Sequence, residues 1–140
     1  MKLLDFDDLS EGFVLPAITK QPITQVQIAK FAGASGDFNP IHLDSDFAQK
    51  NGLESTISHG MLVMGIIGQL ISSTFKMESV QKFSINFIKV TKPGDILTVN
   101  GTIKKKYELD NCKYIACELF VKEIQSNEIK ASGQAVLKFN

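Results

Sequence analysis

Residues 31–75 read FAGASGDFNPIHLDSDFAQKNGLESTISHGMLVMGIIGQLISSTF, and the fold is decided by the second part of this stretch. Gly60 to Phe75 carries no charged side chain, and its large apolar residues fall on every side of a helix. This pattern predicts a helix that is buried on all faces. Because Gln69 interrupts the run, which is also shorter than the roughly 20 apolar residues of a bilayer span, we expect a core helix and no membrane segment.

Gly65 and Gly68 lie three positions apart on the predicted helix. Each glycine costs about 1 kcal/mol of helix stability relative to alanine, so something should lie close to the backbone there. One explanation is a sheet wrapped tightly around the helix, and the other is a ligand tunnel beside it. We favour the sheet, because isolated helix glycines more often have packing causes.

Length and charge restrict the classes of protein to consider. A chain of 140 residues can bury a substantial core, and we expect residues 1–140 to form one domain. Fifteen basic and fifteen acidic residues cancel, with Lys104–Lys106 as the main basic cluster, which argues against a nucleic-acid partner. Asp5, Asp7 and Asp8 stand where a signal peptide needs an apolar core, which predicts a cytoplasmic protein.

Cys112 and Cys117 stand an odd number of positions apart in a segment with the pattern of a strand. Their side chains should therefore point to opposite faces of a sheet. We expect no disulfide and no metal site from them, and interpret them as reduced packing residues.

The segments before the polar loop carry boundary signals. Phe13–Thr19 alternates as a strand does. Thr24 and Gln27 have the spacing of a capping box, in which the hydroxyl and the amide each satisfy a free backbone N–H at a helix start. That helix should end near Gly33 or Gly36.

An irregular loop is expected over residues 35–44, because it is polar and contains Gly36 and Asn39-Pro40. After it, Asp44 or Ser45 can cap a short helix that Gly52 closes.

Beyond the buried helix the apolar period changes to two, with Phe83, Ile85 and Phe87 on one face, which indicates a strand. Short turns separate the further strand-like runs 96–107, 112–124 and 129–139. Consecutive strands of this kind predict an antiparallel meander that curls over the helix. The expected class is α+β, an antiparallel β-sheet wrapped around a long central α-helix.

The loop holds the residues with the clearest chemical potential. Asp37 and His42 flank a turn in which Asn39 can bond its own backbone and Pro40 fixes φ, so the two side chains could face one another. A rigid aspartate and histidine pair is a general acid and base device. It could hold a water, with Asp37 taking a proton and His42 fixing the water or returning a proton.

Two other interpretations compete with this one. Asp37 and Asp44 could be helix caps, with His42 a satisfied surface histidine, and spacing alone does not exclude this. A metal site formed by His42, His59 and a carboxylate is chemically feasible, but paired-ligand spacing is missing, so we expect no metal.

Ser58-His59-Gly60 precedes the buried helix, which places the Gly60 N–H among the free donors at the positive end of that helix. Such a donor can bind a developing oxyanion, and glycine lets a ligand approach. His59 is, with Gly60, a candidate for binding the oxyanion or substrate, and for its side chain we favour a structural role at the helix entry over proton transfer.

The residues of the loop and helix start resemble a known motif. Ser35-Gly36-Asp37-Phe38-Asn39-Pro40-Ile41-His42-Leu43-Asp44, then Ala48, then His59-Gly60-Met61, is similar to the hydratase 2 motif of MaoC-like, (R)-specific enoyl-thioester hydratases and 3-hydroxyacyl-thioester dehydratases. The similarity is strongest from about residue 24 to residue 95.

This resemblance implies a hot-dog fold that adds water reversibly to trans-2-enoyl thioesters and yields (3R)-3-hydroxyacyl thioesters, without a cofactor. The substrate would be an acyl-CoA or a thioester of acyl carrier protein (ACP). By the resemblance, Asp37 and His42 hold the water, Asn39 supports them and the Gly60 N–H binds the thioester oxygen. The assembly implied is a homodimer, or a heterodimer with a non-catalytic sister chain.

Two positions depart from the family pattern. Ser45 stands where proline is common, which affects the following helix more than the chemistry. Gly68 stands where some relatives place a serine hydroxyl near the histidine, so His42 must be supported from elsewhere. Two rival functions remain, a hot-dog thioesterase and a non-catalytic subunit that binds acyl thioesters.

Overall fold

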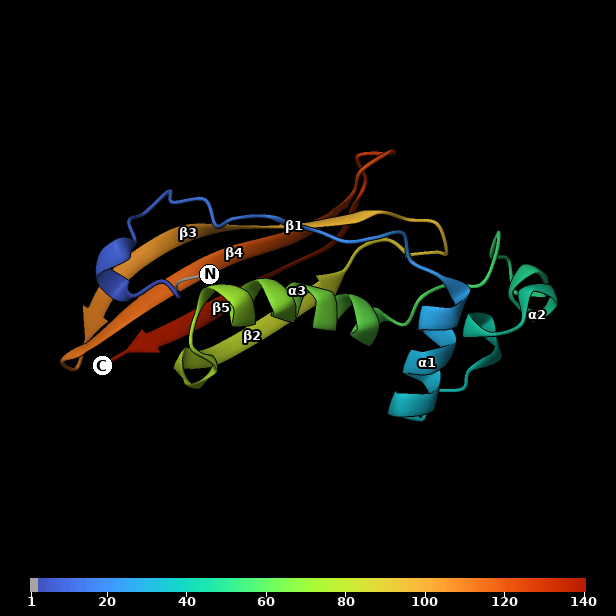
Figure 1. The fold of residues 1–140 in the computed structure, drawn as a ribbon, viewed down its shortest axis with the longest axis horizontal. Coiled ribbons are helices and arrows are strands. Elements are labelled where there is room, and N and C mark those ends of the chain that lie inside the picture. Colours follow the sequence, from blue (N-terminus) through green and yellow to red (C-terminus); the bar gives the residue numbers. More distant parts are fainter. Residues whose placement is uncertain (1–2) are drawn as a thin grey trace.

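The computed structural model describes residues 3–140 and shows an antiparallel sheet with the strand order β1-β3-β4-β5-β2. The strands are Ile18–Thr19 (β1), Val80–Phe87 (β2), Leu97–Leu109 (β3), Cys112–Glu123 (β4) and Ile129–Phe139 (β5). The helices are Gln25–Ser35 (α1), Ser45–Lys50 (α2) and Gly60–Thr74 (α3), with 3-10 turns at Phe6–Asp8 (η1), Pro40–His42 (η2) and Met77–Ser79 (η3). α3 lies along one face of the sheet, and α1 and α2 lie beyond one end (Figure 1). The predicted α+β class with a central helix is confirmed.

The order of the strands differs from the predicted meander. β3, β4 and β5 do follow one another as antiparallel hairpins, and the β3–β4 turn has Asp110 and Asn111 at positive φ, as a two-residue hairpin turn requires. β2, however, pairs with β5 and forms an edge of the sheet. The chain after β2 must therefore cross from that edge to β3. Alternating polarity identifies strands, but it does not identify their partners.

The first strand is shorter than predicted. Of the expected Phe13–Thr19, only Ile18–Thr19 forms a ladder with β3, and Val14 adds one isolated bridge to Thr102.

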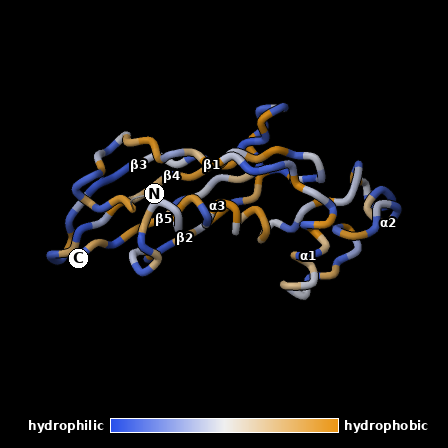
Figure 2. Tube along the Cα trace, in the orientation of Figure 1, coloured by the Kyte–Doolittle hydropathy of each residue, from blue (hydrophilic) through white to orange (hydrophobic). Residues whose placement is uncertain are grey.

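α3 is buried on one side only. Figure 2 shows it mostly in the colour of hydrophobic residues. Met61 is 59% exposed, however, and Gly65, Gln69 and Ser72 continue this exposed stripe along the helix. The prediction of burial on all faces is therefore wrong for the single chain. Within residues 3–140, none of the helices combines the length and the apolar character that a bilayer span needs. The buried side holds Val63, Ile66, Ile67, Leu70, Ile71 and Thr74.

Gly65 and Gly68 of α3 do not mark a tight contact with the sheet. A Cβ added at Gly65 would have no neighbour within 4 Å among the described residues, and one at Gly68 would meet only Phe83, at 3.8 Å. The tight-sheet explanation is therefore wrong for Gly65. A glycine of the sheet does face crowded side chains, because a Cβ on Gly101 of β3 would lie 2.8 Å from Leu15, 3.1 Å from Leu119 and 3.3 Å from Leu70 of α3.

The helix boundaries follow the local signals closely. The Thr24 hydroxyl accepts the Gln27 N–H at 3.0 Å, but the Gln27 side chain makes no reciprocal bond, so only half of the predicted capping box forms. α1 ends at Gly36, with φ at 77°. Asp44 caps α2, and Gly52 follows its end with φ at 84°. These signals position both ends of the polar loop.

Both cysteines are free thiols in β4. Cys117 is buried, and this burial raises the pKa of its thiol to about 12. Cys117 therefore stays protonated at neutral pH and packs as a small apolar residue.

Candidate active site

Two successive side-chain turns shape the loop between α1 and α2. Asp37 Oδ1 accepts the Asn39 N–H at 3.2 Å, and Asn39 Oδ1 accepts the Ile41 N–H at 3.2 Å. Pro40 then begins η2, which ends at His42. Asn39 thus bonds its own backbone as predicted, and the loop folds back so that Asp37 and His42 face one another.

The predicted pair does come together. Asp37 Oδ2 lies 3.8 Å from His42 Nε2, too far for a direct hydrogen bond. The His42 side chain is 8% exposed and the Asp37 side chain 55% exposed. The alternative of a surface histidine is therefore wrong. Asp44 is a helix cap as that alternative supposed, whereas Asp37 caps no helix.

A backbone carbonyl supports His42. Its Nδ1 lies 2.8 Å from the Ile57 oxygen. A carbonyl oxygen only accepts hydrogen bonds, so Nδ1 must carry the proton, and Nε2 then presents its lone pair on the side of Asp37. His42 is thus supported without a side-chain hydroxyl at position 68.

A second contact, which the sequence did not predict, fixes the backbone of η2. Gln25 Nε2 donates to the His42 carbonyl at 2.7 Å, and Gln25 Oε1 accepts from the Thr56 hydroxyl at 2.6 Å. Gln25 therefore ties η2 to the segment that supplies the Ile57 carbonyl. No sequence signal marks a glutamine in the first turn of a helix as such a clamp.

His59 has a structural role, but not the expected one at the helix entry. It is the N-cap residue of α3, yet its side chain makes no cap hydrogen bond. Instead, Nε2 donates to the Asp37 carbonyl at 3.0 Å, and the ring stacks on His42, with 3.8 Å between centroids and 26° between planes. His59 is 2% exposed, and its Nδ1 has no partner within residues 3–140. His59 thus holds the Asp37 loop against α3.

Gly60 opens α3 at the wall of a cavity of about 310 Å³, which is also lined by His42, Val63 and Phe87. Its N–H has no acceptor among the described residues. The aromatic ring of Phe87 would lie 3.1 Å from a Cβ at this position, so glycine suits the contact. The cavity therefore joins a free donor at a positive helix end to the side chain of His42.

A metal ion is the alternative occupant of this site. Asp37, His42 and His59 each offer a donor atom, and these atoms lie within 4.8 Å of one another. One nitrogen of each ring faces a carbonyl oxygen, which leaves His42 Nε2 and His59 Nδ1 as the possible ligand atoms. The stacked rings, however, direct their in-plane lone pairs along nearly parallel planes, whereas a tetrahedral ion needs them to converge. The geometry thus favours a water site over a metal site.

Comparison with known proteins gives one consistent family. The family model described as MaoC like domain matches residues 14–124. A 3-hydroxybutyryl-CoA dehydratase of Methylorubrum extorquens is 28% identical over 140 residues, covering 99% of this chain and 85% of the relative. An (R)-specific enoyl-CoA hydratase of Rhodospirillum rubrum is 31% identical over 100 residues, covering 70% of this chain and 68% of the relative. The solved structure of an (R)-hydratase from A. caviae superposes with a TM-score of 0.78 at 27% identity, covering 94% of this chain and 98% of the solved chain. The hot-dog fold expected from the motif is confirmed.

The carbonyl contacts predict opposite tautomers for the two histidines. At a pH where both rings are neutral, His42 should carry its proton on Nδ1 and His59 on Nε2, since each faces a backbone oxygen. Long-range ¹H–¹⁵N correlation spectra of the protein distinguish the two forms. A His42 ring protonated on Nε2 would contradict the arrangement described above.

Proposed function

Because the chain belongs to the family of MaoC-like domains, we propose that it adds water reversibly to trans-2-enoyl thioesters and gives (3R)-3-hydroxyacyl thioesters. The names of its relatives, an (R)-specific enoyl-CoA hydratase and a 3-hydroxybutyryl-CoA dehydratase, support this proposal. The observation that carries it is the Asp37–His42 pair beside a cavity that ends at the free Gly60 N–H.

A water molecule between Asp37 and His42 would be the nucleophile. The two facing atoms, 3.8 Å apart, are both acceptors when Asp37 is ionised and His42 is neutral. A water can donate one hydrogen to each of them, which orients its oxygen lone pair toward the cavity. One of the two groups takes a proton as the oxygen bonds to the β-carbon, and that proton is then available for the α-carbon. Dehydration follows the same steps in reverse.

The N-terminus of α3 would activate the substrate. If the thioester oxygen accepts the Gly60 N–H, the developing enolate charge lies at the positive end of the helix. Polarising the carbonyl in this way makes the β-carbon electrophilic. Asn39 and His59 touch no reacting atom in this scheme and act by positioning, Asn39 through the turn and His59 through the Asp37 carbonyl and the His42 ring.

The proposal is tested with Asp37→Asn and His42→Ala. Each should lower hydration of crotonyl-CoA or crotonyl-ACP by roughly 100- to 10,000-fold, because each removes one of the two groups that move protons. Asp37→Asn should change the melting temperature little, since the Asp37 side chain is 55% exposed, whereas His42→Ala removes a buried, stacked ring and should lower it, so both rates are measured at a temperature where the variants are folded. Absorbance of the enoyl thioester reports the rate, and both carriers should be assayed.

Asp46→Asn is the matched control, because Asp46 is an exposed carboxylate in α2 outside the pair. It should retain wild-type rates. A product of S configuration would contradict the proposal, and so would wild-type activity in folded Asp37→Asn. Release of free thiol without hydration would favour a thioesterase, and binding without turnover would favour a non-catalytic subunit.

Gly60→Pro isolates the proposed oxyanion donor. Gly60 is the first residue of α3, where proline is well tolerated, and His59 already has the ψ of 137° that a residue before proline prefers. The substitution removes the N–H while keeping the helix, so we expect kcat to fall about 100- to 1000-fold. Gly60→Ala is the control. It keeps the N–H and needs only a small shift of the half-exposed Phe87 ring. Equal activity in the two variants would exclude this donor.

We propose a homodimer that covers the open side of the site. β2 is an edge strand, and the apolar side chains of Met61, Phe87, Ile88 and Val90 are each at least half exposed near the cavity. A second copy could bury these groups and pair with the β2 edge. A heterodimer with a sister chain is the alternative and would use the same surface.

Light scattering should give twice the chain mass of 15.4 kDa at micromolar concentration. Ile88→Lys should shift the protein toward the monomer, because it places a charge in the proposed interface. Leu109→Lys is the control, since Leu109 is equally exposed but lies at the β3–β4 turn. A wild-type protein that is monomeric by itself would rule out the homodimer.

A further inference from the structure

A short segment after β2 forms a wall of the cavity. Residues 88–91 line it together with His42 and Gly60, and the side chains of Ile88 and Val90 are 53% and 51% exposed. A second cavity of about 380 Å³ adjoins the first, since residues 89, 90 and 130 line both. We call these two adjoining cavities the groove, of which the first is lined by Gly60 and the second by Glu54 and Lys92.

Lys130 of β5 anchors the segment twice. Its backbone carbonyl accepts the N–H groups of Ile88, at 2.9 Å, and Lys89, at 3.1 Å, and its Nζ donates to the Val90 carbonyl at 3.0 Å. On the other side, the Thr91 carbonyl accepts the Ser58 N–H at 2.6 Å. Because Ser58 directly precedes His59 and Gly60, these bonds set the spacing between the segment and the start of α3.

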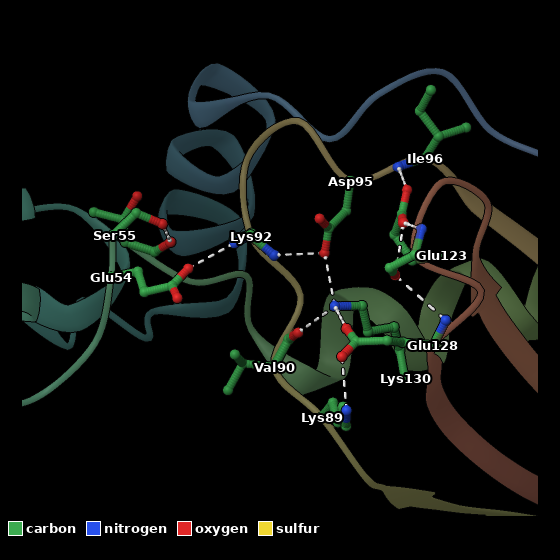
Figure 3. A network of polar contacts seen from close by, with 12 residues as sticks. Glu54, Ser55, Lys89, Val90, Lys92, Asp95, Ile96, Glu123, Glu128 and Lys130 are labelled. Atoms are coloured by element: carbon green, nitrogen blue, oxygen red, sulfur yellow. Dashed lines mark hydrogen bonds and ion pairs between the residues drawn. The ribbon is translucent and has the colours of Figure 1, made fainter.

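The Lys130 ammonium is buried at the centre of a polar network (Figure 3). The residue is 5% exposed, and Nζ lies 3.2 Å from a carboxylate oxygen of Asp95 and 3.2 Å from one of Glu128. Nζ thus donates hydrogen bonds to the Val90 carbonyl and to Glu128, and it forms an ion pair with Asp95. Burying such an ion contributes little net stability, and a well-packed apolar residue is often as stable. Stability alone therefore does not account for a lysine here.

The rim of the groove is electrically balanced. Lys89 pairs with Glu128 at 2.6 Å, and Lys92 pairs with Glu54 at 2.8 Å. Hydrogen bonds from Lys89 and Lys130 lower the pKa of Glu128, so it stays ionised at neutral pH. The lysines of this rim are thus already neutralised, and the groove suits an uncharged chain better than a phosphate.

We propose that Lys130 is a positioning residue for the carrier arm of the substrate. The arm is the pantetheine chain, an uncharged diamide common to CoA and to ACP, and it would lie along residues 88–91 with the thioester at Gly60. Lys130 holds this wall through the Val90 carbonyl. The inference rests on the hydratase function proposed above. Because the arm does not react, the wall binds it equally in the ground state and the transition state, so its loss raises KM and leaves kcat nearly unchanged.

The test compares Lys130→Met with the double variant Lys130→Met/Asp95→Asn. The double variant also removes the charge of Asp95, which would otherwise stay buried without its partner. Hydration of crotonyl-CoA and crotonyl-pantetheine should show KM raised about tenfold on both substrates, with kcat within about threefold of the wild type. Lys130→Arg should restore part of the loss, because it keeps a donor for the Val90 carbonyl. An increase in KM confined to crotonyl-CoA would overturn the proposal, since Lys130 would then act on phosphate.

Lys106→Met is the matched control. Like Lys130, Lys106 uses its Nζ to bind backbone carbonyls, those of Phe6 and Leu9 at 2.9 and 2.8 Å, but it lies at the end of the sheet that carries η1 (Figure 1). This variant should lower the melting temperature and leave KM unchanged. If both Lys130 variants lower the melting temperature while KM stays within twofold of the wild type, Lys130 is structural only and the proposal fails.

Amide hydrogen exchange separates this inference from the hydratase proposal. Loss of the Val90 anchor should speed exchange of the Ser58 N–H, which bonds Thr91, in the Lys130 variants but not in Lys106→Met. A wild type without hydratase activity would refute the proposed function. Unchanged Ser58 exchange in the double variant would instead refute the positioning role of Lys130.

Discussion

The burial of one face of α3 against the sheet is the interaction on which the site depends. Ile67 and Leu70 are fully buried in this contact, and each such side chain contributes about 1.5–3 kcal/mol relative to exposure. Gly101 in β3 leaves room for Leu15 and Leu119 as well as for Leu70, so a side chain at this position would push against the helix contact. The axis of α3 is thereby fixed, and with it the direction of the Gly60 N–H. An apolar contact at one end of the helix thus orients a polar donor at the other.

His59 transmits this fixed position to the loop that carries the acid and base groups. Its backbone belongs to the start of α3, while its ring contacts the Asp37 carbonyl and the His42 ring. Phe31 of α1 packs near the same ring, with 4.9 Å between centroids. A residue that contacts the helix start, the loop and α1 can hold the proposed water and oxyanion positions in register. This accounts for the burial of His59, a histidine that transfers no proton in the proposed reaction.

Sequence analysis succeeded where a local signal determines the structure. Thr24, Gly36 and Asn39 act through their own backbone or that of near neighbours, so a helix cap, a helix end and a turn could each be predicted from a few residues. The turn between Asp37 and His42 also predicted that these two residues face one another, and the motif then implied their roles. The Ile57 carbonyl that supports His42 was not predictable, because every residue carries a carbonyl and only the tertiary fold selects one. The pairing of β2 with β5 was not predictable for a related reason, because alternating polarity along a strand does not tell which strand lies beside it.

The single chain exposes both the Asp37 carboxylate and apolar side chains around the site. Asp37 is more than half exposed, although a carboxylate in bulk water is a poor device for orienting a single water molecule. The outer stripe of α3 and the apolar side chains around β2 are both exposed, and a Cβ added at Gly65 would meet no neighbour within 4 Å among residues 3–140. A partner that packs on this surface would bury the apolar groups and exclude water from the site in one event. In that case one chain supplies the reacting groups by itself, whereas the exclusion of water from the site requires a second chain.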